Sequence, residues 1–176
     1  YYAAFANYRL AMLERARSDG RAREAIQRCV ENLNRALKAR KDFPEALALN
    51  AACLETKADQ KPWTAPLSAS KRSSHIERAL KLAPKNPRVL LLDALETRDA
   101  SQAVTQLKKA VQAFEAERQD VSRAPGWGAA EAYLQLGHTY LHLGEVLEAR
   151  DAFERALVIA PEFVQARRAL SNITSG

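Results

Sequence analysis

Two histidines and a glutamate near the C-terminal end of the chain have the side chains and the spacing of a zinc site. His138 and His142 are four residues apart, and Glu131 precedes His138 by seven. In a helix these intervals place all three on one face, and imidazole and carboxylate groups bind zinc. However, Thr139 replaces the glutamate of the His-Glu-x-x-His motif, and no third close ligand is evident. We therefore expect polar, pH-sensitive residues of a binding surface, with a metal-dependent function as a minor alternative.

Two cysteines, Cys29 and Cys53, could form a disulfide or remain as buried thiols. Both are expected on the inner faces of neighbouring antiparallel helices, and a disulfide needs their α-carbons within about 7 Å of each other. The register permits this distance without requiring it. The favoured interpretation is two buried thiols that act as small hydrophobic side chains. A disulfide would instead indicate an oxidising compartment.

The sequence lacks the short motifs of common enzyme classes. It has no Gly-x-Ser-x-Gly, no Cys-x-x-Cys, no P-loop and no Gly-x-Gly-x-x-Gly. Gly126-Trp127-Gly128 lacks both the third glycine and a preceding strand. We therefore expect neither catalytic activity nor a cofactor.

The elements that must position these side chains are helices, and the clearest pair lies between residues 133 and 161. The first helix has an apolar face at intervals of three and four residues with a glycine beside it, and the second has a small-large-small face. The residues are Tyr133, Leu136, Gly137 and Tyr140 in the first helix and Ala149, Phe153 and Ala156 in the second. Gly144 is placed to end the first helix and Pro161 to end the second. The spacing predicts a hairpin of two closely packed helices.

This spacing resembles the tetratricopeptide repeat (TPR), whose pattern is Trp-x2-Leu-Gly-x2-Tyr, Ala-x3-Phe, Ala and Pro. Every position matches except that Tyr133 stands in place of the tryptophan. Related helix endings recur as Arg35-Ala36-Leu37, Arg78-Ala79-Leu80 and, more weakly, Lys109-Ala110-Val111. One repeat cannot bury its apolar face alone, and about three or more are needed for stability. The resemblance therefore implies an array.

The expected fold is all-α, an α–α superhelix (TPR-like solenoid) of about four helix hairpins plus a C-terminal capping helix. It would form one domain over residues 1–176, with hairpins at about 1–41, 44–84, 87–120 and 129–160 and the capping helix at 162–174. Residues 58–71 are expected to form a loop, after which Ser74 and Glu77 would start the fourth helix as a capping box. Asp99 is expected to cap the sixth helix. The absence of an alternating apolar pattern argues against a sheet.

The chain is basic, with a net charge of +6 and a pI near 9.5. Such a charge suits an acidic partner or a nucleic acid. The basic residues are dispersed, however, several pair with acidic residues four positions away, and no aromatic residues are interleaved with them. We therefore expect no nucleic-acid binding. No run of 18 apolar residues exists, so no membrane insertion is expected.

The TPR resemblance implies that the first helix of each hairpin lines a concave groove that binds a peptide or helix of a partner protein. The groove residues would be Glu45, Ala48, Leu49, Ala52, Arg88, Leu91, Leu95, Glu131, Leu134, His138, Leu141 and His142. Leu134 and His138 replace the lysine and asparagine with which some TPR proteins clamp a C-terminal carboxylate, which argues against that ligand. The alternative is a structural or self-assembling subunit that uses the same face for oligomerisation.

The chain begins at Tyr1, without a methionine, inside an expected helix, so we expect a fragment or a processed product. The stretch Trp127-Gly128-Ala129-Ala130-Glu131-Ala132-Tyr133 and the Leu82-Ala83-Pro84 helix ending resemble exported bacterial TPR proteins. This resemblance favours the periplasm or export over the cytoplasm.

Overall fold

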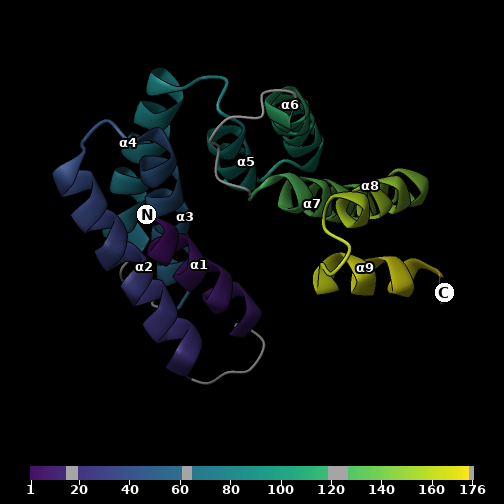
Figure 1. Cartoon of the computed structure of the whole chain (residues 1–176), viewed down its shortest axis with the longest axis horizontal. Coiled ribbons are helices and arrows are strands. Elements are labelled where there is room, and N and C mark those ends of the chain that lie inside the picture. Colours follow the sequence, from purple (N-terminus) through teal and green to yellow (C-terminus); the bar gives the residue numbers. More distant parts are fainter. Residues whose placement is uncertain (15–19, 61–64, 119–126, 175–176) are drawn as a thin grey trace. The chain divides into compact units, whose positions relative to one another are not determined.

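The computed structural model describes residues 1–14, 20–60, 65–118 and 127–174, and all regular structure in these ranges is α-helical (Figure 1). The all-α, solenoid-type architecture is thus confirmed. The chain divides into two compact units, Tyr1–Pro84 and Lys85–Gly176, which are described separately.

The N-terminal unit contains two helix hairpins. Its helices are α1 (Tyr2–Glu14), α2 (Gly20–Ala39), α3 (Pro44–Gln60) and α4 (Ala65–Leu82). Helix α1 pairs with α2, α3 pairs with α4, and α2 packs against α3. The amphipathic α2 buries one face, which carries Ile26, Cys29 and Leu33, whereas every residue of α3 from Ala46 to Leu54 is buried. Helix α3 therefore forms the centre of this unit.

A disulfide joins Cys29 of α2 to Cys53 of α3. The two α-carbons are 6.4 Å apart, within the range that a disulfide can bridge. Both side chains are fully buried, so the bond lies inside the core. The sequence-based preference for two separate thiols was therefore wrong, because spacing along the chain did not determine the register of α2 against α3.

The loop predicted at 58–71 is largely helical. Helix α3 continues to Gln60 and α4 begins at Ala65; residues 61–64 lie outside the described ranges. Pro66 falls in the first turn of α4, where a proline is tolerated because the N–H that it lacks has no partner within the helix. Ser74 and Glu77 consequently lie inside α4 and do not start it.

The C-terminal unit contains two further hairpins and a final helix. Its helices are α5 (Pro87–Leu95), α6 (Ala100–Arg118), α7 (Ala129–His142), α8 (Val146–Ile159) and α9 (Val164–Thr174). Helix α5 pairs with α6 and α7 pairs with α8, while α7 also packs on α6 and α9 on α8. Helix α7 therefore lies between α6 and α8, which are the second helices of their respective hairpins.

Side-chain caps and glycines set the helix ends of this unit. The Asp99 carboxylate accepts a hydrogen bond from the backbone N–H of Gln102 at 2.7 Å, which confirms the predicted cap of α6. The Asn86 side chain accepts from the N–H groups of Arg88 and Val89 at the start of α5. Gly144, with a φ of 79°, adopts the left-handed conformation that favours glycine just after a helix.

The predicted close contact within the α7–α8 hairpin is present. A β-carbon added to Gly137 of α7 would lie 2.4 Å from a ring atom of Phe153 on α8. Phe153 is fully buried, so its ring fills the space that the missing side chain leaves. The glycine is therefore required by packing, which outweighs its intrinsic cost of about 1 kcal/mol within a helix.

Candidate functional site

The predicted groove residues of α7 divide into a buried half and an accessible half. Leu134 is buried, and the Glu131 carboxylate accepts the backbone N–H of Gly128 at 3.0 Å, which fixes the start of the helix. His138 and His142 are exposed, with Leu141 half-buried beside them. The C-terminal half of α7 thus presents three of the predicted residues on its surface.

Arg88 and Leu91 of α5 were also predicted to line the groove, but both are buried. The Arg88 guanidinium pairs with Glu117 at 2.8 Å and lies over the rings of Phe114 and Trp127, 5.4 and 5.7 Å from their centroids. Arg88 therefore packs inside the unit, where a carboxylate and two aromatic rings replace its hydration. Leu95, at the end of α5, is 39% exposed.

The remaining predicted groove residues belong to α3 in the N-terminal unit. Ala48, Leu49 and Ala52 are buried, and Glu45 is half-buried. These residues were assigned to the groove by matching their positions to the repeat pattern. That pattern does not indicate that α3 is almost completely buried within its unit.

Partial burial lowers the pKa of His138 from its usual value, so its imidazole is neutral at neutral pH. The ring packs edge-on against Phe153, with 5.2 Å between ring centroids. A neutral imidazole can donate and accept one hydrogen bond each, which suits contact with peptide groups. Within the described ranges, no three histidine, cysteine, aspartate or glutamate side chains are grouped so that they could hold a metal ion.

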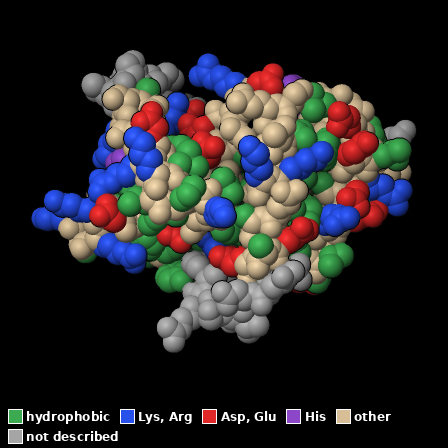
Figure 2. All heavy atoms as spheres, turned by 90° about the horizontal axis from the view of Figure 1, so that it is seen from above, with side chains coloured by type: hydrophobic (Ala, Val, Ile, Leu, Met, Phe, Trp, Pro, Cys, Tyr) green, Lys and Arg blue, Asp and Glu red, His purple; other side chains and the backbone are tan. Residues whose placement is uncertain are grey.

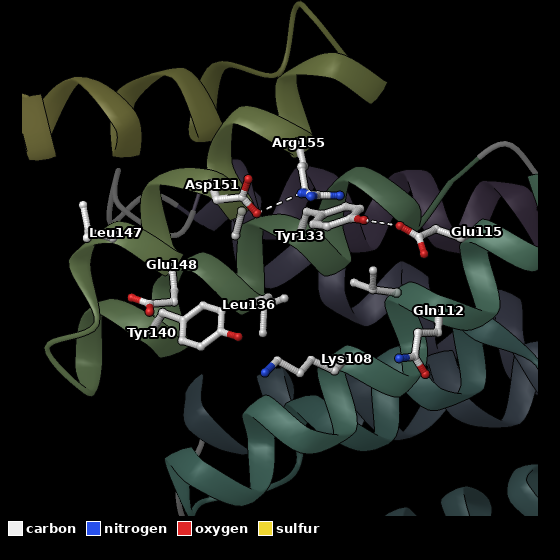
Figure 3. Close-up of a pocket in the computed structure, with 12 residues that line it drawn as sticks. Lys108, Gln112, Glu115, Tyr133, Leu136, Tyr140, Leu147, Glu148, Asp151 and Arg155 are labelled. Carbon is white, nitrogen blue, oxygen red and sulfur yellow. Dashed lines mark hydrogen bonds and ion pairs between the residues drawn. The ribbon is translucent and has the colours of Figure 1, made fainter.

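A second feature of the C-terminal unit is a cleft of about 520 Å³, which we call the α6–α8 cleft (Figure 3). Its floor is formed largely by α7, and its walls by α6 and α8. The lining residues are Lys108, Val111, Gln112 and Glu115 from α6, Tyr133, Leu136 and Tyr140 from α7, and Leu147, Glu148, Asp151, Ala152 and Arg155 from α8.

One polar contact connects the α6 wall of the cleft to its floor, and an ion pair lies within the α8 wall. The Tyr133 hydroxyl donates to Glu115 at 2.6 Å, and Arg155 pairs with Asp151 at 2.8 Å, as Figure 3 shows. Burial, followed by the hydrogen bond to Glu115, raises the pKa of Tyr133, and the nearby Arg155 partly opposes this. The phenol therefore stays protonated and remains a donor. A tryptophan, which is usual at this position of the repeat, has no hydroxyl group.

The other end of the cleft holds a cation against an aromatic ring. The Lys108 ammonium lies 5.6 Å from the centroid of Tyr140. Its hydrogen bond to Tyr140 raises the pKa of Lys108, with further contributions from the charges of Glu145 and Glu148. Sequence reasoning had assigned both tyrosines to the hairpin core. The tyrosine in place of tryptophan at position 133 was the only signal in the sequence of a polar contact on this face.

The paired antiparallel helices define an α-helical repeat protein. Part of the chain also matches a known repeat family. Residues 130–163 match the family model described as a tetratricopeptide repeat. Residues 130–163 thus form one recognisable tetratricopeptide repeat, within a helical fold that is similar to those of solved TPR proteins. No curated protein matches the chain.

Solved structures with a similar fold include TPR proteins. A thermophilic TPR protein of Thermus thermophilus, TTC0263, has a TM-score of 0.65 and 16% identity, covering 98% of this chain and 82% of its own. MamA has a TM-score of 0.54 and 18% identity, covering 89% and 81% respectively. The hetero-tetramer Cut9–Hcn1 of the APC/C gives 0.51 and 13% identity over 98% of this chain but only 40% of the other.

The described helices contain none that is long and apolar enough to cross a membrane. On the face shown in Figure 2, lysine and arginine side chains lie scattered among acidic ones and do not gather in one patch.

Proposed function

We propose that the protein is an interaction module that holds a peptide segment of a partner protein against the C-terminal half of α7. The TPR fold supports a protein-binding scaffold in general. The observation that carries the finer proposal is the exposure of His138 and His142 beside the half-buried Leu141 on the first helix of the matched repeat. The leucine supplies an apolar contact, and the imidazoles supply hydrogen bonds to peptide groups.

Repeat proteins of this fold generally act as scaffolds and not as enzymes. The disulfide between α2 and α3 further supports a location in an oxidising compartment, since such bonds are rare where thiols are kept reduced. An exported scaffold is the function that these observations together support best.

The direct test replaces His138 and His142 together with alanine. The ligand would be a peptide selected from a random displayed library against the whole chain, and its affinity would be measured by isothermal titration calorimetry. We expect the double variant to bind this peptide at least about tenfold more weakly, because each contact at a binding hot spot contributes about 1 kcal/mol or more. The melting temperature should fall only slightly, because His142 is exposed and the loss at His138 is limited to its edge contact with Phe153.

His75→Ala is the matched control, because His75 lies on α4, a second helix of the N-terminal unit. It should leave peptide affinity unchanged. Equal affinity of the double variant and the native chain would show that the peptide binds elsewhere. If light scattering gave a mass well above 19.5 kDa, and the double variant alone restored that mass, the same face would instead serve oligomerisation.

A further inference from the structure

The α6–α8 cleft lies apart from the surface that the proposed peptide site uses. None of His138, Leu141 and His142 lines it. The cleft is bounded by the second helices α6 and α8, whereas the peptide site is on the exposed part of the first helix α7. The C-terminal unit therefore has a second surface whose chemistry the proposed function does not explain.

Apolar groups form the floor of the cleft and continue onto its rim. Leu136 and Ala152 are buried at the floor, whereas Leu147, which also lines the cleft, is 78% exposed. In the adjoining α7–α8 turn and the start of α8, Leu143 and Val146 are exposed as well. Exposed apolar residues that are grouped in this way mark contact surfaces. A ligand of this cleft should therefore contribute at least one apolar side chain.

The charges of the cleft favour a basic ligand. Three carboxylates, Glu115, Glu148 and Asp151, line it with two cations, so the cleft has one more negative than positive charge. The chain as a whole carries +6. Oppositely charged surfaces steer and orient partners, which makes this local excess of negative charge significant.

Both cations of the cleft are already engaged by its own groups. Arg155 pairs with Asp151, and Lys108 lies over the Tyr140 ring. Glu148 and Glu115 are both exposed at the cleft walls. In Figure 3 the Glu148 carboxylate lies near the Tyr140 ring. Because Lys108 already lies over that ring, an incoming cation would pair with the exposed carboxylate at the α8 wall and not with the ring.

We propose that the α6–α8 cleft docks a basic amphipathic segment of a partner protein. An aliphatic side chain of that segment would contact Leu147 and the floor, and a lysine or arginine would pair with Glu148. The cleft volume of about 520 Å³ accommodates a few side chains and not a whole helix. The segment would therefore lie across the rim and insert its anchors.

The probe is a fluorescent Leu–Lys amphipathic peptide of roughly 18 residues, long enough to form a helix, and its Leu–Glu counterpart. Fluorescence anisotropy should show binding of the Leu–Lys peptide and much weaker binding of the Leu–Glu peptide. Glu148→Lys should weaken the binding of the Leu–Lys peptide about tenfold, through loss of attraction and gain of repulsion. Leu147→Ser should weaken it about fivefold through loss of apolar contact.

Each variant has a matched control on α8 outside the cleft. Glu154→Lys makes the same charge change, and Val158→Ser makes an equivalent change at a residue that is also 78% exposed. Both controls should alter affinity less than about twofold, as expected for surface substitutions away from a contact. Equal effects of the cleft and control variants would overturn the proposal, as would equal affinities of the two peptides.

The proposed peptide site on α7 and the α6–α8 cleft can be distinguished by testing the variant of each site with the peptide of the other. The alanine double variant at His138 and His142 should bind the Leu–Lys peptide normally, and Glu148→Lys should bind the library-selected peptide normally. If only the histidine variant lost the Leu–Lys peptide, the cleft proposal would fail while the proposed function stood.

Discussion

Replacing Phe153 with alanine is expected to lower the free energy of unfolding of the C-terminal unit by about 3–5 kcal/mol. The side chain is fully buried against Gly137 of α7 and the ring of His138, and no smaller residue could fill the space between the two helices. Urea unfolding followed by circular dichroism would measure the change. Val158→Ala, an exposed substitution on the same helix, should change the free energy by less than about 0.5 kcal/mol.

The same contact allows a double-mutant cycle. Gly137→Ala alone should be destabilising, because its β-carbon would lie 2.4 Å from the Phe153 ring. In the Phe153→Ala background that carbon has room, and alanine is the better helix former by about 1 kcal/mol. Gly137→Ala should therefore become neutral or stabilising there. Additive effects of the two changes would contradict the packing described for the hairpin.

Removing the disulfide should have the other large effect, confined to the N-terminal unit. Cys29 and Cys53 are 24 residues apart, and closing a loop of that size stabilises the folded chain relative to the unfolded chain by about 3.5 kcal/mol in the chain-entropy model. The variant with alanine at both positions, or the native chain in reductant, should therefore unfold at lower urea concentration. Hydrogen exchange resolved by peptide would show the loss of protection in α2 and α3.

Reductant provides an internal control for this prediction. It should leave the alanine double variant unchanged, because that variant has no cysteine left. Protection of α7 and α8 should also stay unchanged, because both helices belong to the other unit. Equal stability of the oxidised and reduced native chain would show that the bond contributes nothing to the fold. Thiol trapping in the native host would show whether the bond forms there.

The sequence predicted best those features that depend on local chemistry. The period of the apolar residues around Tyr133 and Phe153 identified the α7–α8 hairpin, and Asp99 and Gly144 marked helix ends as expected. The start of α4 was missed because Pro66 was interpreted as a loop residue, although a proline also fits the first helical turn.

The site was harder to predict because exposure depends on packing between helices. Arg88 has a charged side chain on the first helix of a hairpin, as a groove residue would. However, Glu117, Phe114 and Trp127 surround it, and nothing in the local sequence indicates that environment. Tyr133 was predicted only as an apolar core residue. Its hydroxyl became informative once α6 placed Glu115 within hydrogen-bonding distance.

The histidines offer the most direct test of the claim that α7 holds a partner peptide. The chain has three, so two-dimensional NMR should resolve the ring signals of His75, His138 and His142. Titration with the library-selected peptide should shift the His138 and His142 signals along one saturable curve and leave His75 unchanged. A saturable binding curve by calorimetry with no shift of either α7 histidine would contradict the account.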